Sequence, residues 1–141
     1  MAWRIFLLLL LSLLPLEASA RGPHPAQADG SVYEPDSTSP EEVFAQMRHS
    51  FRADRARGQH LRYQFNLREP QGGKWWVEIE DGACTMGKGD IAHPDVTFSC
   101  TGADWVRLSN GTLSGFQAFI TGRLHVAGSR FTAHKLDEIF P

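Results

Sequence analysis

The sequence predicts an α+β fold: a five-stranded, mainly antiparallel sheet with helices packed on one of its faces. Three observations lead to this fold class. Apolar residues recur at helical spacing after residue 40, alternate with polar residues between 61 and 100, and return to helical spacing beyond 101. A period of 3.6 residues indicates an amphipathic helix, and a period of two indicates a half-buried strand. Strands grouped between helices are typical of one sheet covered by a helical layer.

The first helix is expected to begin after residue 39. Ser39 is a suitable N-cap, Pro40 fits the first helical position, and Glu42 completes a capping box. The helix is expected to end near Gly58, because glycine is common just beyond a helix. Four apolar residues at helical spacing form its buried stripe: Val43, Phe44, Met47 and Phe51.

Four strands are expected to follow this helix. Their apolar residues alternate with polar ones, and the runs are 61–67, 75–80, 84–86 and 96–100. Turn residues separate the first three runs, at 69–73 and again at Asp81 and Gly82. Because short connections join antiparallel neighbours, the sequence predicts a meander of consecutive antiparallel strands.

The C-terminal part returns to helices and adds a fifth strand. Thr101 is a suitable cap for a short helix that ends near residue 110. Ser114 is a suitable cap for a second helix, which Gly122 ends. A fifth strand is expected at 124–126, and Ser129 begins a last helix that runs to residue 140.

The first 20 residues predict a secretory signal peptide. Arg4 precedes an apolar run from 5 to 14, and Ala18-Ser19-Ala20 is the small-x-small pattern that signal peptidase accepts. A run of about 10 residues is too short for a membrane anchor, which needs about 20. Residues 21–38 are rich in Pro, Gly, Ala and Ser and predict a disordered leader. A single domain is therefore expected over 39–141, with a secreted or periplasmic location.

The two cysteines predict a disulfide. Cys84 and Cys100 lie in the part expected to be exported, where an oxidising compartment keeps such bonds formed. If their strands pair as antiparallel neighbours in a register centred on Ala92, the two cysteines lie opposite each other on the buried face. Opposed Cα atoms lie about 4.5 to 5.5 Å apart, close to the preferred disulfide span. Two free, buried cysteines are one alternative, and a register shifted by one residue is another.

Composition and motifs argue against several classes of function. The formal net charge of −2 gives no reason to expect a nucleic-acid partner. Neither a G-x-S-x-G nucleophile elbow nor a phosphate-binding loop is present, so we assign no catalytic residue, expect no cofactor and predict that the chain is not an enzyme. The histidines lack the spacing of a metal site, so none is expected. They are His24, His49, His60, His93, His125 and His134.

The segment 119–128 carries the most specific motif. It reads Phe-Ile-Thr-Gly-Arg-Leu-His-Val-Ala-Gly and resembles the F-x-x-G-(K/R)-L-x-(I/V)-x-G signature of the sterol carrier protein (SCP) domain family. The strand at 75–79 resembles the W-x-V-D-V strand of that family, and 94–98 resembles its (A/P)-D-V-T-(I/L) strand. Lys135 and Leu136 match the K-L of its closing helix. The resemblance covers the chain from about residue 39 to residue 140.

This resemblance implies an apolar tunnel between the sheet and the helices. Members of the family bind fatty acids, acyl-CoA, sterols or other lipids there and move them between membranes. The resemblance assigns the lining of the tunnel to large apolar residues of the sheet and the helices. They are Phe98, Trp105, Leu108, Phe116, Phe119, Ile120, Leu136, Ile139 and Phe140.

The leading hypothesis is therefore non-catalytic binding and transfer of an apolar lipid, with transient contact with a membrane surface. A second hypothesis is an accessory module that presents an apolar substrate to a partner enzyme, and a third is a structural domain with a filled core. The sequence leaves open the identity of the lipid and the oligomeric state. It also leaves open whether Asn110 is glycosylated, since Asn110-Gly111-Thr112 is both a sequon and an ordinary helix end.

Overall fold

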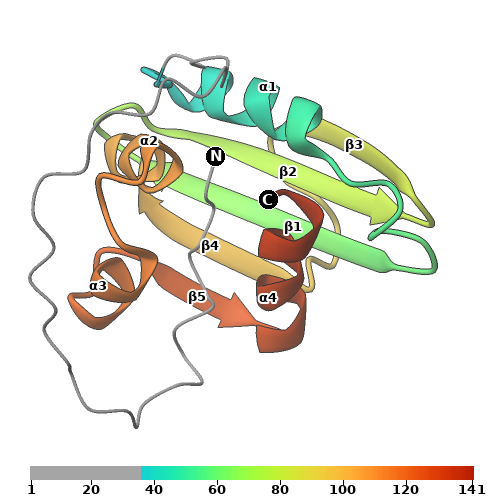
Figure 1. Cartoon of the computed structure of the whole chain (residues 1–141). Coiled ribbons are helices and arrows are strands. Elements are labelled where there is room, and N and C mark those ends of the chain that lie inside the picture. The colour runs from blue at the N-terminus through green and yellow to red at the C-terminus, as the bar shows by residue number, and fades with distance from the viewer. Residues whose placement is uncertain (1–35) are drawn as a thin grey trace, which may run out of the picture.

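The computed structural model describes residues 36–141 (Figure 1). The signal peptide expected at 1–20, and nearly all of the leader expected at 21–38, lie outside the described residues. No helix in the described part combines the length and the apolar character that crossing a membrane requires. The elements are α1 (Pro40–Ser50), β1 (His60–Arg68), β2 (Gly73–Glu80), β3 (Ala83–Lys88), β4 (Val96–Thr101), α2 (Gly102–Asn110), α3 (Gly115–Ile120), β5 (His125–Gly128) and α4 (Arg130–Ile139).

The cap residues begin the helices where the sequence predicts. Ser39 Oγ accepts a hydrogen bond from the backbone N–H of Glu42 at 3.3 Å. Thr101, Ser114 and Ser129 cap α2, α3 and α4 in the same way, each accepting from the N–H three residues further along the chain. Each cap satisfies an N–H that has no partner within its own helix, which fixes where the helix begins.

The end of α1 differs from the prediction. The helix stops at Ser50 rather than near Gly58, because Phe51 leaves helical geometry with φ −59° and ψ 127°. The backbone N–H of Arg52 then donates to the carbonyl oxygen of Ile139 at 2.8 Å. This contact ties the segment after α1 to the end of α4, so the chain turns there instead of continuing the helix.

The five strands form one sheet in the order β3-β2-β1-β4-β5. The pairs β1–β2, β2–β3 and β4–β5 are antiparallel, and β1–β4 is parallel. The predicted five-stranded, mainly antiparallel sheet is confirmed. The predicted meander of consecutive strands is wrong, because β4 lies next to β1 and not next to β3.

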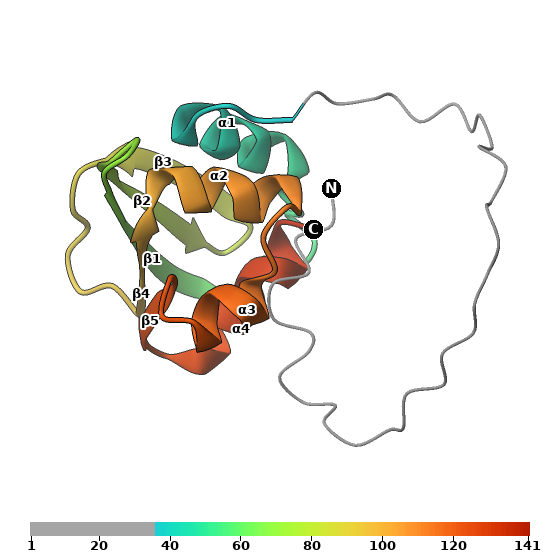
Figure 2. The same ribbon diagram turned by 90° about the vertical axis from the view of Figure 1, so that its left-hand side faces the viewer.

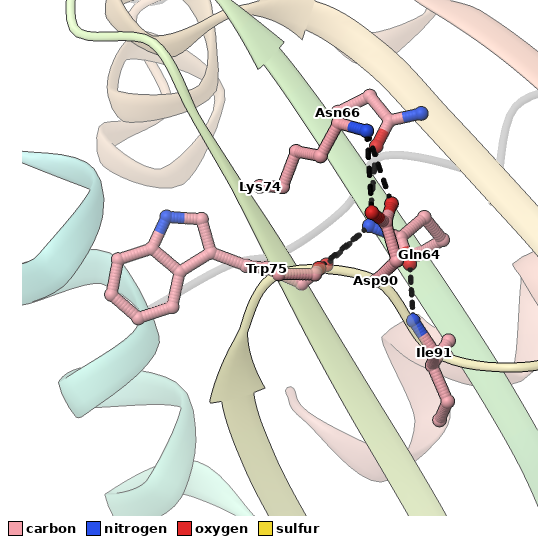
Figure 3. A network of polar contacts seen from close by, with 7 residues as sticks. Gln64, Asn66, Lys74, Trp75, Asp90 and Ile91 are labelled. Carbon is pink, nitrogen blue, oxygen red and sulfur yellow. Dashed lines mark hydrogen bonds and ion pairs between the residues drawn. The ribbon is translucent and has the colours of Figure 1, made fainter.

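The connection from β3 to β4 crosses the face of the sheet that the helices leave open, and Gln64 anchors it there (Figure 3). Gln64 Nε2 donates to the carbonyl oxygens of Gly89, at 3.0 Å, and Trp75, at 3.2 Å. The backbone N–H of Ile91 donates to Gln64 Oε1 at 2.9 Å. Gln64 is 4% exposed, so this amide is a buried polar group whose bonds hold the crossing segment in place. A parallel pair needs such a crossover.

This topology separates the two cysteines and corrects the predicted disulfide. Cys84 of β3 pairs with Ile79 of β2, which pairs with Leu61 of β1, whereas Cys100 of β4 pairs with Leu67 of β1. The cysteines are therefore three strand spacings apart, about 14 Å, and about six residues apart along the strands. A disulfide needs Cα atoms within about 7 Å. Both thiols are free, and burial raises the pKa of Cys84 to about 11 and that of Cys100 to about 12.

The core lies between the sheet and a helical layer on one side (Figure 2). Phe44 of α1 stacks on Trp75 of β2, with ring centroids 4.6 Å apart, and meets Phe65 of β1 edge-on at 5.1 Å. Trp105 of α2 lies 4.9 Å from Phe65. Aromatic side chains therefore fill the half of the core that lies under α1 and α2.

Tyr63 joins the sheet to α4 in the other half. Its hydroxyl donates to the carbonyl oxygen of Thr132 at 2.8 Å, and the side chain is buried. Burial is the main cause that raises the pKa of Tyr63 above 10, and the negative charge of Asp95 adds to it. A raised pKa means that the folded state favours the protonated phenol, so its contribution to stability is complete below pH 10 and is lost as pH rises further.

We expect Tyr63→Phe to lower the free energy of unfolding by about 1 kcal/mol at neutral pH, because one buried hydrogen bond is lost. We also expect this variant to lose less stability than the wild type as pH rises above about 10, since it lacks the ionisable phenol. Urea unfolding of both proteins between about pH 8 and pH 11 measures the two effects. Parallel stability curves across that range would contradict the assignment of Tyr63.

Candidate functional site

Six of the nine residues assigned to the tunnel lining lie in one buried apolar cluster. They come from β4, from α2, and from α4 with the residue that follows it. Each is at most 2% exposed: Phe98, Trp105, Leu108, Leu136, Ile139 and Phe140. The predicted pattern of apolar positions therefore brings these side chains together between the sheet and the helices.

The other three assigned residues, Phe116, Phe119 and Ile120, lie on the outer surface of α3. Their exposed fractions are 41%, 42% and 60%. Spaced at i, i+3 and i+4, they share one face of the helix. That face points away from the core, and the opposite face buries Gly115 and Ala118.

The packing of α3 is thus the reverse of that of an ordinary amphipathic helix. A surface helix normally turns its large apolar residues inward. Here the small residues allow α3 to sit close to the core, and the backbone N–H of Leu124 donates to the carbonyl oxygen of Ala118 at 2.9 Å. Helical spacing alone cannot reveal this, because it shows that a stripe exists but not which side faces the sheet.

The interior changes character along the sheet. Under α1 and α2 it is filled by aromatic rings, whereas α3 and α4 contribute the small side chains of Ala118 and Ala133 together with the aliphatic side chains of Leu136 and Ile139. These two helices lie near the two ends of β5 (Figure 1). Val126 of β5, paired with Phe98 of β4, is half-buried against the same cluster. Sequence reasoning missed the two alanines, because it searched for large apolar residues only.

Ion pairs hold α2 to the segment that follows α3. The side chain of Asp104 is 13% exposed, and one of its carboxylate oxygens lies 3.4 Å from Arg123 Nη1 and 3.7 Å from Arg107 Nη1. Both arginine side chains are about half exposed. One acid therefore positions two cations, one on α2 and one just after α3, and leaves a net positive charge there.

Asn110, the asparagine of the sequon, holds the start of the described chain. Its Nδ2 donates to the carbonyl oxygen of Ser37 at 2.8 Å, and its Oδ1 accepts from the N–H of Ser37 at 2.9 Å. The nitrogen that a glycan would modify is therefore engaged in an internal hydrogen bond. We interpret Asn110 as a structural clamp at the end of α2.

A polar hollow of about 280 Å³ lies on the open face of the sheet. One of its lining residues, Arg62, lies 2.8 Å from Glu78 through Nε and donates to the carbonyl oxygen of Ala92 at 3.1 Å. The hollow is lined by His60, Leu61, Arg62, Glu78, Ile79, Glu80, His93 and Asp95. Its charges are mixed in sign, which gives no preference for a cationic or an anionic ligand. Within residues 36–141, no three His, Cys, Asp or Glu side chains converge as metal ligands would.

The model of the SCP-2 sterol transfer family matches residues 41–141. Hydroxysteroid dehydrogenase-like protein 2 from Homo sapiens is 29% identical over 106 residues, which are 74% of this chain and 25% of that protein. The chain therefore spans about a quarter of the length of this relative.

Two solved structures share the fold. The sterol carrier protein domain 2 of Helicoverpa armigera is 27% identical with a TM-score of 0.54, covering 74% of this chain and 91% of that one. Palmitated SCP2L2 from Aedes aegypti is 23% identical with a TM-score of 0.58, covering 73% of this chain and 95% of that one. A sheet with helices on one face is common to these proteins and to residues 40–139 here.

Proposed function

The chain belongs to the SCP-2 sterol transfer family, and on this premise we propose that it binds an apolar lipid of the fatty-acid class and carries it between membranes without changing it chemically. The observation that carries the proposal is the apolar layer under α3 and α4. Ala118 and Ala133 contribute small side chains to this layer beside the larger Leu136 and Ile139, whereas the layer under α1 and α2 is packed with aromatic rings. An acyl chain would lie in the layer under α3 and α4 and end against the aromatic rings under α1 and α2.

The buried residues of the assigned lining form the walls of this proposed site. Phe98 and Leu136 face the layer from the sheet and from α4. The helix α3 covers it with two small residues and is only six residues long, so opening the layer requires few buried contacts to break. We infer that α3 moves outward when the lipid enters.

Burial of the acyl chain supplies the affinity. Each buried methylene contributes about 0.8 kcal/mol, so a long chain contributes on the order of 10 kcal/mol before costs. Ordering the chain and losing its translational freedom removes much of this gain. Moderate net affinity follows, and it suits a carrier that must also release its ligand.

A fatty acid is the first ligand to test because the solved structure from Aedes aegypti is described as palmitated. Export is part of the proposal: residues 1–20 have the pattern of a signal peptide, which favours action in the periplasm or outside the cell. The alternative of an accessory module has one observation in its favour, since the human relative is about four times as long as the segment matched here. Co-purification with a stable enzyme partner would favour that alternative.

A fluorescent polyene fatty acid tests binding directly. Trp105 borders the proposed site, so its emission should transfer to the bound polyene. We expect saturable transfer at one probe per chain, which unlabelled palmitate then reverses. Failure of the wild-type protein to take up any apolar probe would remove the carrier function.

A further inference from the structure

The large apolar side chains that are exposed in the described part of the chain all fall between residues 116 and 131. They are Phe116, Phe119, Ile120 and Phe131, with exposed fractions of 41% to 64%. The first three form one contiguous face of α3. Clustered apolar exposure of this kind marks a contact surface, because isolated exposed residues would be spread over the molecule.

Charge is distributed unevenly around the same segment. The chain as a whole has a net charge of −2, but no Asp or Glu occurs from residue 105 to residue 136. The charged residues in that stretch are all cationic: Arg107, Arg123, Arg130 and Lys135. Arg107 on α2 and Arg123, three residues after α3, share the ion-pair partner Asp104, and their side chains are about half exposed.

We propose that Phe116, Phe119 and Ile120, together with Arg107 and Arg123, form a face that docks α3 on an anionic lipid bilayer. The apolar side chains enter the interface between headgroups and acyl chains, and the guanidinium groups bind the lipid phosphates. An apolar helix face flanked by exposed guanidinium groups from neighbouring segments suits this surface. The inference rests on the proposed function, since it places the helix that covers the lipid layer against the donor or acceptor membrane.

Charge favours a bilayer over a second copy of the chain as the occupant of this face. Two copies meeting through the docking face would bring Arg107 and Arg123 against the same cations of the partner, and like charges repel. An anionic membrane has the opposite sign and attracts them. The face is therefore matched to phospholipid headgroups and mismatched to itself.

Sedimentation with phospholipid vesicles tests the proposal. We expect the wild-type protein to bind vesicles that contain roughly a third phosphatidylglycerol at least tenfold more tightly than pure phosphatidylcholine, and to release them at high salt. The triple variant Phe116→Ser/Phe119→Ser/Ile120→Ser should bind the anionic vesicles at least tenfold more weakly. Gln117→Ser, a polar change on the exposed side of the same helix, is the matched control and should bind as the wild type does.

A second variant separates charge from folding effects. Arg107→Gln/Arg123→Gln should lose most of the preference for anionic vesicles and most of the salt dependence, while its far-UV spectrum stays unchanged. Equal binding of the wild type to neutral and anionic vesicles would overturn the proposal, as would a concentration-dependent dimer that the triple variant abolishes. If the wild-type protein takes up fatty acid but does not bind vesicles, only the docking face is overturned. If it binds vesicles but takes up no fatty acid, the proposed function is overturned.

Discussion

Replacing Ala133 with Leu is expected to weaken palmitate binding about 30-fold while the protein remains folded. Ala133 is 1% exposed on α4 and borders the layer that we assign to the acyl chain. The larger side chain would displace two to three methylenes of the ligand, at about 0.8 kcal/mol each, which is about 2 kcal/mol or 30-fold in Kd. Displacement of the fluorescent fatty acid measures the affinity, and urea unfolding measures the stability.

Ala127→Leu is the matched control for this experiment. Ala127 lies on β5, pairs with Thr97 and points to the open face of the sheet, where it is exposed. The same substitution there should leave palmitate binding unchanged. Unchanged affinity in Ala133→Leu, with a stability loss of about 1 to 3 kcal/mol from overpacking, would instead indicate a filled core with no room for a ligand.

The second large effect is expected at Gly102, the first residue of α2. A Cβ atom at this position would lie 1.7 Å from the carbonyl oxygen of Gln71, so the backbone of the β1–β2 turn would have to move. The turn and the helix are joined there by a hydrogen bond from the N–H of Ala103 to the carbonyl oxygen of Pro70, at 3.1 Å. We expect Gly102→Ala to lower the free energy of unfolding by about 3 kcal/mol.

Gly111→Ala, at the other end of α2, is the control for Gly102→Ala. Gly111 has a φ of +76°, and a Cβ atom there would meet nothing within 4 Å. Only the cost of a left-handed conformation applies, about 1 to 2 kcal/mol. Thermal or urea unfolding compares the two variants. Equal losses would show that the contact between Gly102 and Gln71 is looser than the structure indicates.

Local sequence patterns predicted the helices and strands well, but they could not predict which distant strands pair. The caps at Ser39, Thr101, Ser114 and Ser129 begin helices where expected, because each cap acts within four residues. The pairing of β4 with β1 depends on a crossover connection. In the sequence, only one residue, Gln64, could have indicated that crossover. Gln64 alternates in sequence like any solvated strand residue, yet it is buried and bonds to the crossing segment.

The disulfide prediction was wrong for the same reason, because the sequence did not predict the crossover. Cys84 and Cys100 can be opposed only if β3 and β4 are neighbours, and the crossover places β2 and β1 between them. The resemblance to the family supplied the fold class correctly, and it assigned the large apolar side chains of α3 to a tunnel lining. Which face of α3 is buried depends on the small residues Gly115 and Ala118, whose role becomes visible only in three dimensions.

The most direct measurement of the central claim is native mass spectrometry of the purified chain. Binding of an apolar lipid between the sheet and the helices predicts a species heavier than the bare chain by the mass of one lipid of the fatty-acid class. That species should persist after gel filtration and be depleted in Ala133→Leu. A spectrum with only the bare chain, even after incubation with excess palmitate, would contradict the account.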